Sequence, residues 1–248
     1  MILLVDAGNS RVKWRVQQAG QCLGAGNVPT AQADALRQAW ALLRPVVALV
    51  CCVAGASARQ RIAEALPVAP DAVRWLAAEA TGHGVVNHYR PPESLGADRY
   101  AALVATRRGL AGAWVVVGVG TALTADMLGA EGDFLGGCIC PGPELMRDAL
   151  SQGAAGLAGV QEAPDVDGTH APLDTGAAVT QGIGLALAGV VAGMCERLAR
   201  QSAQAPGILL FGGARRALRP FLSGHVEERE DWVLEGLAWI ARDMGFDA

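Results

Sequence analysis

The feature that most constrains the fold is a pattern that occurs twice along the chain. Near the N-terminus an apolar strand, residues 1–5, ends at a polar turn that contains Gly8 and Asn9, and an alternating segment follows up to Gly20. The same order returns close to half of the 248 residues later, where Val115–Thr121 aligns with Leu3–Asn9. A strand, glycine turn and strand in each half predict two similar α/β units in tandem, at 1–111 and 112–248. Gly8 and Asn9 are residue types that are able to adopt positive φ in such a turn.

Outside the repeated segments, the spacing of apolar residues predicts alternating helices and buried strands in both units. Apolar spacing and flanking breakers predict the helices 31–43, 58–66, 98–110, 144–152 and 183–194. Continuous apolar runs predict buried strands at 46–53 and 114–119, and strand-like alternation continues at 138–140. No long linker separates the halves, so we expect them to share a cleft.

Composition excludes several classes of function. The only lysine is Lys13, so no P-loop motif exists. The net charge is -4 and no basic run is present, which argues against nucleic acid and anionic membranes as partners. The six cysteines include no C-x-x-C pair and the four histidines show no ligand spacing. The longest apolar stretch, Val46–Ala58, is too short to span a bilayer, and the N-terminus lacks a signal pattern. We therefore expect a cytoplasmic protein.

The first turn carries residues suited to phosphate chemistry. Gly8 permits close approach of backbone N–H groups, and Asn9 and Ser10 add donors. Asp6 is a candidate Mg²⁺ ligand, and Lys13 follows on the next strand. The same residue types also form ordinary hairpin turns.

The second turn, Gly118–Asp126, offers another glycine turn with two threonine hydroxyls. It is not a dinucleotide fingerprint, because Leu123 occupies the third glycine position. Two facing turns, one from each half, would hold a polyphosphate and its metal from both sides.

Two further motifs leave alternatives open. Asp98 is either a general base or a helix N-cap, and Arg99 is a candidate anion contact. Thr175 is either an N-cap or a hydroxyl donor to substrate.

Together these motifs resemble the type III pantothenate kinases, the family that also carries the Bvg accessory factor name. The resemblance rests on an ordered series that covers most of the chain: D-x-G-N-S at 6–10, G-x-D-R at 96–99, G-T-A-x-T-x-D at 120–126, G-G-x-I-x-P-G at 136–142, the Thr175 region, Gly212-Gly213 and L-x-G-L at 234–237. It implies two actin-like (ribonuclease H-like) α/β domains with ATP between them, in a homodimer. The implied reaction is ATP-dependent phosphorylation of pantothenate, the first step toward coenzyme A.

The resemblance also implies roles for individual residues. The implied ATP contacts are Asp6, Ala7, Gly8, Asn9, Ser10, Arg11, Val12, Lys13 and Thr121, with Asp6 also holding Mg²⁺. The implied pantothenate contacts are Tyr89, Gly96, Ala97, Asp98, Arg99 and Thr175, with Asp98 as the base. The family also implies a monovalent cation, K⁺ or NH₄⁺. This chain has Gly118 where the family usually has an aspartate, which argues against that cation, and Asp174 in place of an asparagine.

Two other functions stay open on sequence grounds. One is a kinase-like accessory protein that binds ATP or pantothenate with little or no turnover. The other is a different actin-like kinase acting on a sugar or acetate, which the G-x-D-R element fits less well.

Overall fold

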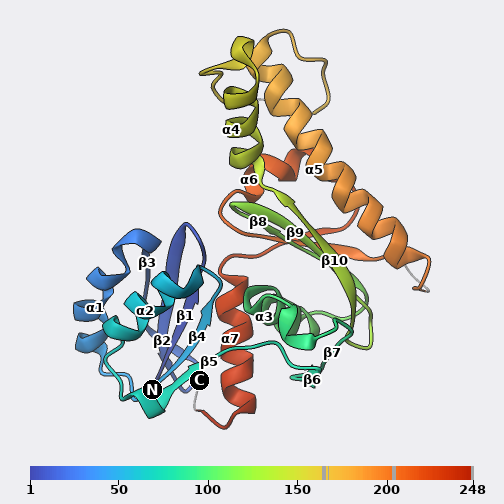
Figure 1. Cartoon of the computed structure of the whole chain (residues 1–248). Helices are drawn as coiled ribbons and strands as arrows, with labels where there is room; N and C mark the ends of the chain where they lie inside the picture. Colours follow the sequence, from blue (N-terminus) through green and yellow to red (C-terminus); the bar gives the residue numbers. More distant parts are fainter. Residues whose placement is uncertain (164–165, 167, 203–204, 247–248) are drawn as a thin grey trace. The chain divides into compact units, whose positions relative to one another are not determined.

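The computed structural model describes residues 1–163, 166, 168–202 and 205–246 (Figure 1). The chain divides into two compact units, Met1–Leu110 with Asp231–Ala248, and Ala111–Glu230. The predicted division placed 231–248 with the second half, whereas the structure places it with the first. The reason is the packing of the C-terminal helix, Trp232–Asp243, on the helix Ala97–Gly109. A Cβ atom at Gly236 would collide with the backbone carbonyl of Ala101, so the backbones of these two helices lie in direct contact.

The first unit is built on a five-stranded sheet. Its strands are β1 (Ile2–Ala7), β2 (Arg11–Gln18), β3 (Gln21–Pro29), β4 (Val47–Cys52) and β5 (Val73–Trp75), in the order β3-β2-β1-β4-β5. β1 pairs antiparallel with β2 and parallel with β4. Its helices are α1 (Leu36–Leu43), α2 (Gly55–Ala65), α3 (Ala97–Gly109) and α7 (Trp232–Asp243), and a short hairpin joins β6 (Thr81–Gly82) to β7 (Val85–Asn87).

Alternation along β1 decides what each sheet face meets. Leu3, Val5 and Ala7 belong to a buried core that includes Trp40 and Ile62 from α1 and α2. The intervening residues face the other side, where α3 and α7 pack (Figure 1). Asp6 is therefore directed toward the helices α3 and α7 rather than into the α1–α2 core.

The second unit repeats the strand topology of the first. Its strands are β8 (Trp114–Val119), β9 (Ala122–Leu128), β10 (Asp133–Pro141), β11 (Gly207–Phe211) and β12 (Val226–Glu228), in the order β12-β11-β8-β9-β10. As with β1, the central strand β8 pairs antiparallel with the next strand and parallel with the fourth. Its helices are α4 (Pro143–Gly153), α5 (Thr175–Ala199) and α6 (Arg215–Leu218). The internal repeat predicted from sequence is thus present in the topology of each unit.

The structure corrects one predicted helix and settles the backbone of the first turn. The segment predicted as one helix over 31–43 is a 3-10 segment, Thr30–Ala35, followed by α1, because the backbone at Gln32 is non-helical. Gly8 and Asn9 do not adopt positive φ in the described chain, since the hairpin closes through a bond from the Gly8 N–H to the Arg11 carbonyl.

The sequence analysis did not identify α5 as a helix that could span a membrane. Within the described residues, α5 is the only helix whose length and composition would allow it to cross a bilayer, and 28% of its apolar window is buried. Core helices of soluble proteins meet the same criteria.

Candidate active site

The first unit gathers four charged side chains around the end of β1. Lys13 stands opposite Asp6 in the β1–β2 register, and Asp98 lies in the first turn of α3. Asp231 precedes α7, and its Oδ1 lies 2.8 Å from the Lys13 Nζ. Asp6 is within electrostatic range of the other three groups. The structure thus brings together Asp6, Lys13 and Asp98, which the sequence analysis selected separately.

Asp6 carries a strongly perturbed carboxyl group. Its pKa is raised from 3.8 to about 7, mainly by removal from water and then by the negative charges of Asp98 and Asp231, while Lys13 opposes the shift. In the part of the chain that the structure describes, no hydrogen bond or ion pair satisfies this carboxylate. A desolvated carboxylate without a partner suits a hard cation such as Mg²⁺. The residues present therefore fit the metal that the family pattern implies.

Asp98 is not the N-cap of its helix. The N-cap of α3 is Gly96, and the Asp98 carboxylate accepts the backbone N–H of Arg99 at 2.9 Å. A Cβ atom at Gly96 would lie 2.7 Å from Asp98 Oδ1, so a larger residue at position 96 would displace the carboxylate from this position. Burial raises the pKa of Asp98, while the Arg99 N–H and guanidinium lower it. A raised pKa moves a carboxylate toward the range useful to a general base.

Arg99 contributes a cationic side chain to this region, and Tyr89 contributes a neutral one. Arg99 is 6% exposed, and its Nη2 donates to the Tyr89 hydroxyl at 3.3 Å. The guanidinium carbon also lies 5.6 Å from the Tyr89 ring centroid. The Tyr89 N–H donates to the Asn87 side chain, which ties this loop to its own hairpin. A buried guanidinium next to a phenol is suited to a carboxylate or phosphate of a small substrate.

Thr30 stabilises the turn between β1 and β2, whose residues are suited to phosphate binding. Its hydroxyl donates to the Gly8 carbonyl at 2.7 Å, and its N–H donates to the Ser10 carbonyl at 3.0 Å. Asn9 and Ser10 are exposed on this turn. Ala7 and Val12 are fully buried members of the core, which limits them to backbone contacts. Arg11 instead donates to the Asn27 side chain.

In the second unit, several glycines pack against the turn after β8. A Cβ atom at Gly142 would collide with the Gly120 carbonyl, and one at Gly212 would collide with the Val119 carbonyl. The Gly142 N–H also donates to the Thr121 carbonyl at 2.9 Å. The motifs that contain these glycines therefore shape one backbone turn, which holds Thr121.

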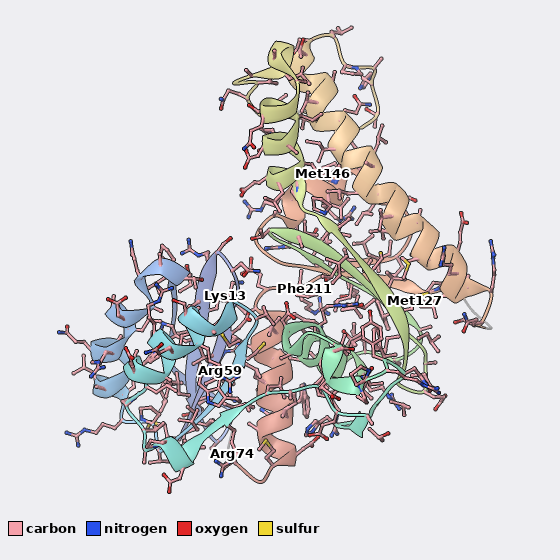
Figure 2. The ribbon with its side chains drawn as sticks, viewed as in Figure 1. Lys13, Arg59, Arg74, Met127, Met146 and Phe211 are labelled. Atoms are coloured by element: carbon pink, nitrogen blue, oxygen red, sulfur yellow. The ribbon has the colours of Figure 1, made fainter. Side chains whose placement is uncertain are left out.

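Gly118 is explained by a neighbour that sequence reasoning missed. A Cβ atom there would lie 2.9 Å from the Phe211 ring and 2.9 Å from the Thr124 hydroxyl, and the backbone φ is not positive. Phe211, labelled in Figure 2, lies at the end of β11, and its ring occupies the space that a side chain at 118 needs. No local sequence signal connects these two positions.

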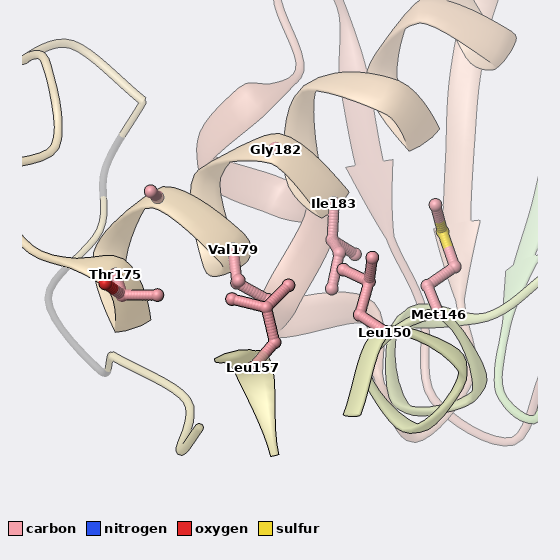
Figure 3. A pocket seen from close by; sticks show the side chains of 8 residues that line it. Met146, Leu150, Leu157, Thr175, Val179, Gly182 and Ile183 are labelled. Carbon is pink, nitrogen blue, oxygen red and sulfur yellow. The ribbon is translucent and has the colours of Figure 1, made fainter. Parts of the chain in front are cut away.

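Thr175 lies at one end of an apolar cavity of about 420 Å³ between α4 and α5 (Figure 3). Met146, Leu150, Val179 and Ile183 line its wall. The N-cap of α5 is Asp174, whose Oδ1 accepts the Ala177 N–H at 2.8 Å, so Thr175 is not the cap. Its hydroxyl is available for another role.

Comparisons with known proteins identify the family. A family model described as type III pantothenate kinase matches residues 2–197. A type III pantothenate kinase from Aromatoleum aromaticum is 41% identical over 250 residues, covering 98% of each chain. One from Chromobacterium violaceum is 37% identical over 243 residues, covering 97% of this chain and 99% of the relative.

Solved structures support the fold. A protein described as a Baf family transcriptional activator from Campylobacter jejuni matches with a TM-score of 0.61, 18% identity and 98% coverage of both chains. A protein described as a 2-dehydro-3-deoxygalactonokinase from Sinorhizobium meliloti matches with a TM-score of 0.60, 18% identity and coverage of 98% and 99%. The predicted class, α/β with two actin-like units, is confirmed.

Proposed function

The chain belongs to the type III pantothenate kinase family, and on that premise we propose how its residues carry out the reaction of the family. The reaction is the ATP-dependent phosphorylation of pantothenate in coenzyme A biosynthesis. The observation that carries the residue assignment is the cluster in the first unit, where Asp6, Lys13 and Asp98 interact electrostatically.

Asp98 is the proposed proton acceptor. The hydroxyl oxygen of pantothenate forms a bond to the γ-phosphorus, the bond between that phosphorus and the bridging oxygen of ADP breaks, and the hydroxyl proton passes to the Asp98 carboxylate. The raised pKa of Asp98 makes it a better acceptor than an ordinary aspartate. Gly96 and Ala97 position this carboxylate at the start of α3.

The remaining residues bind and orient the two substrates. We assign the β1–β2 turn, from Asp6 to Lys13, to the ATP phosphates, with Thr121 of the second unit as a further contact. Asp6 would hold Mg²⁺, which would neutralise charge on the phosphates. Arg99, Tyr89 and Thr175 are assigned to pantothenate, whose carboxylate matches a guanidinium.

A coupled ADP-release assay with ATP, Mg²⁺ and pantothenate tests this function. Pantothenate-dependent turnover is expected, with phosphopantothenate identified by mass spectrometry. Binding of ATP or pantothenate without turnover would overturn the kinase and favour the accessory protein. Repeating the assay with K⁺ or NH₄⁺ tests the monovalent cation, and we expect little response because of Gly118.

We also propose a cytoplasmic homodimer. Along α5, small or apolar residues recur at helical spacing on an exposed face, including Gly182, Leu185 and Gly189, and Leu185 is 52% exposed. A second copy of the helix would cover this face, and two-fold dimers are the commonest oligomers. Light scattering of detergent-free protein tests it: a dimer supports the proposal, while a monomer or a need for detergent contradicts it.

A further inference from the structure

Sheet geometry alone would pair Lys13 with Asp6. The two residues stand directly opposite each other in the β1–β2 register. Opposite residues on one sheet face have Cβ atoms about 4.5–5.5 Å apart, and opposite charges there attract. The ammonium of Lys13 instead pairs with Asp231 at 2.8 Å, and among the described residues no ion pair joins it to Asp6.

The side chain of Asp231 does not cap the helix that it precedes. Aspartate before a helix normally accepts a backbone N–H of the first turn. Asp231 is the N-cap of α7, yet its side chain caps no N–H of that helix. Its backbone lies in the left-handed region, with φ 48° and ψ 34°, a conformation that favours glycine and asparagine.

Packing of α7 fixes this arrangement. The Trp232 Nε1 donates to the buried Thr106 hydroxyl of α3 at 3.0 Å, directly after Asp231. One turn further along α7, Glu235 pairs with Arg15 of β2 at 3.3 Å. Because Arg15 follows Lys13 by two residues on the strand, the two ion pairs form a ladder between β2 and α7.

We propose that Asp231 is a positioning residue for Lys13, which keeps the ammonium away from the Asp6 carboxylate and available to a phosphate group. The inference rests on the proposed function because Lys13 is assigned there to ATP. An ammonium has three N–H donors, so Lys13 can donate to a phosphate while it keeps its bond to Asp231. Without Asp231, the ammonium turns to its cross-strand partner, and the nucleotide loses a cation.

The test compares Asp231→Asn and Asp231→Gly with wild-type protein. Both replacements tolerate the left-handed backbone, so the fold is retained, and circular dichroism and thermal unfolding check this. Glu235→Gln is the matched control because it neutralises the neighbouring acid of the same ladder. Asp231→Glu tests rescue by a carboxylate.

Calorimetric titration with ADP, without pantothenate, gives the primary readout. We expect ADP affinity to fall about tenfold in Asp231→Gly and somewhat less in Asp231→Asn, with the control within about twofold of wild type. KM for ATP should rise by a similar factor while kcat changes less, and Asp231→Glu should recover part of the affinity.

Two outcomes would overturn the inference. One is unchanged ADP affinity in both folded variants. The other is tighter ADP binding, which would mean that Asp231 competes with phosphate for Lys13. A wild-type protein that binds ADP but does not phosphorylate pantothenate would overturn the proposed function instead and leave the ADP comparison intact.

Discussion

Replacing Asp6 by asparagine should stabilise the ligand-free protein at alkaline pH while abolishing its activity. Asp6 has a pKa of about 7 in the folded state against 3.8 for an ordinary aspartate. The folded state therefore binds this proton more tightly than the unfolded state. The stabilisation it provides is present at low pH and is lost as the pH rises through about 7.

The shift sets the size of the effect. At about 1.4 kcal/mol per pKa unit, ionising Asp6 in the folded protein costs at most about 4 kcal/mol. About 2 to 3 kcal/mol of this develops between pH values near 5 and near 8. An asparagine has no proton to lose, so the Asp6→Asn variant should gain up to that amount relative to wild type over the same interval.

Urea unfolding at both pH values, in buffer with EDTA to remove divalent cations, measures this difference. Asp148→Asn, which removes an exposed carboxylate on α4, is the control and should show no comparable gain. The reasoning is refuted if the difference between Asp6→Asn and wild type is the same at both pH values. It is equally refuted if the variant is the less stable protein near pH 8.

Three further predictions concern Asp98, Gly118 and Gly142. Asp98→Asn should fold normally but lose about 10²–10⁴ in kcat, the range for a general base; near-native turnover would reject that role. Gly118→Asp should destabilise the protein by about 1–3 kcal/mol in urea unfolding because the Phe211 ring occupies the space. Phe211→Ala in the same chain should relieve this and raise the response of turnover to potassium; an unchanged response would contradict the cation argument. Gly142→Ala should destabilise by about 2–4 kcal/mol, whereas Gly153→Ala, with open space, should not, and equal thermal unfolding temperatures would be evidence against the backbone contact.

The sequence by itself determined the repeated strand topology and the residue types of the candidate site. Two-residue alternation and glycine turns act over a few residues, so β1, β2 and their counterparts β8 and β9 are readable from local pattern. The acid at the end of β1 and the G-x-D-R element are also local motifs. The family resemblance implied that these two motifs belong to one site, and in the structure Asp98 lies within electrostatic range of Asp6.

Only the tertiary structure decided which partners these residues meet. The Lys13–Asp231 ion pair joins residues 218 positions apart, and the packing of α7 on α3 assigns the C-terminal helix to the first unit. The Phe211 ring occupies the space that a side chain at position 118 would need, and no residue near either position in the sequence indicates this contact. The physical reason is the same in each case. Local pattern sets whether a residue lies on a strand, a helix or a turn, but the occupant of the space beside it comes from a distant segment brought there by packing.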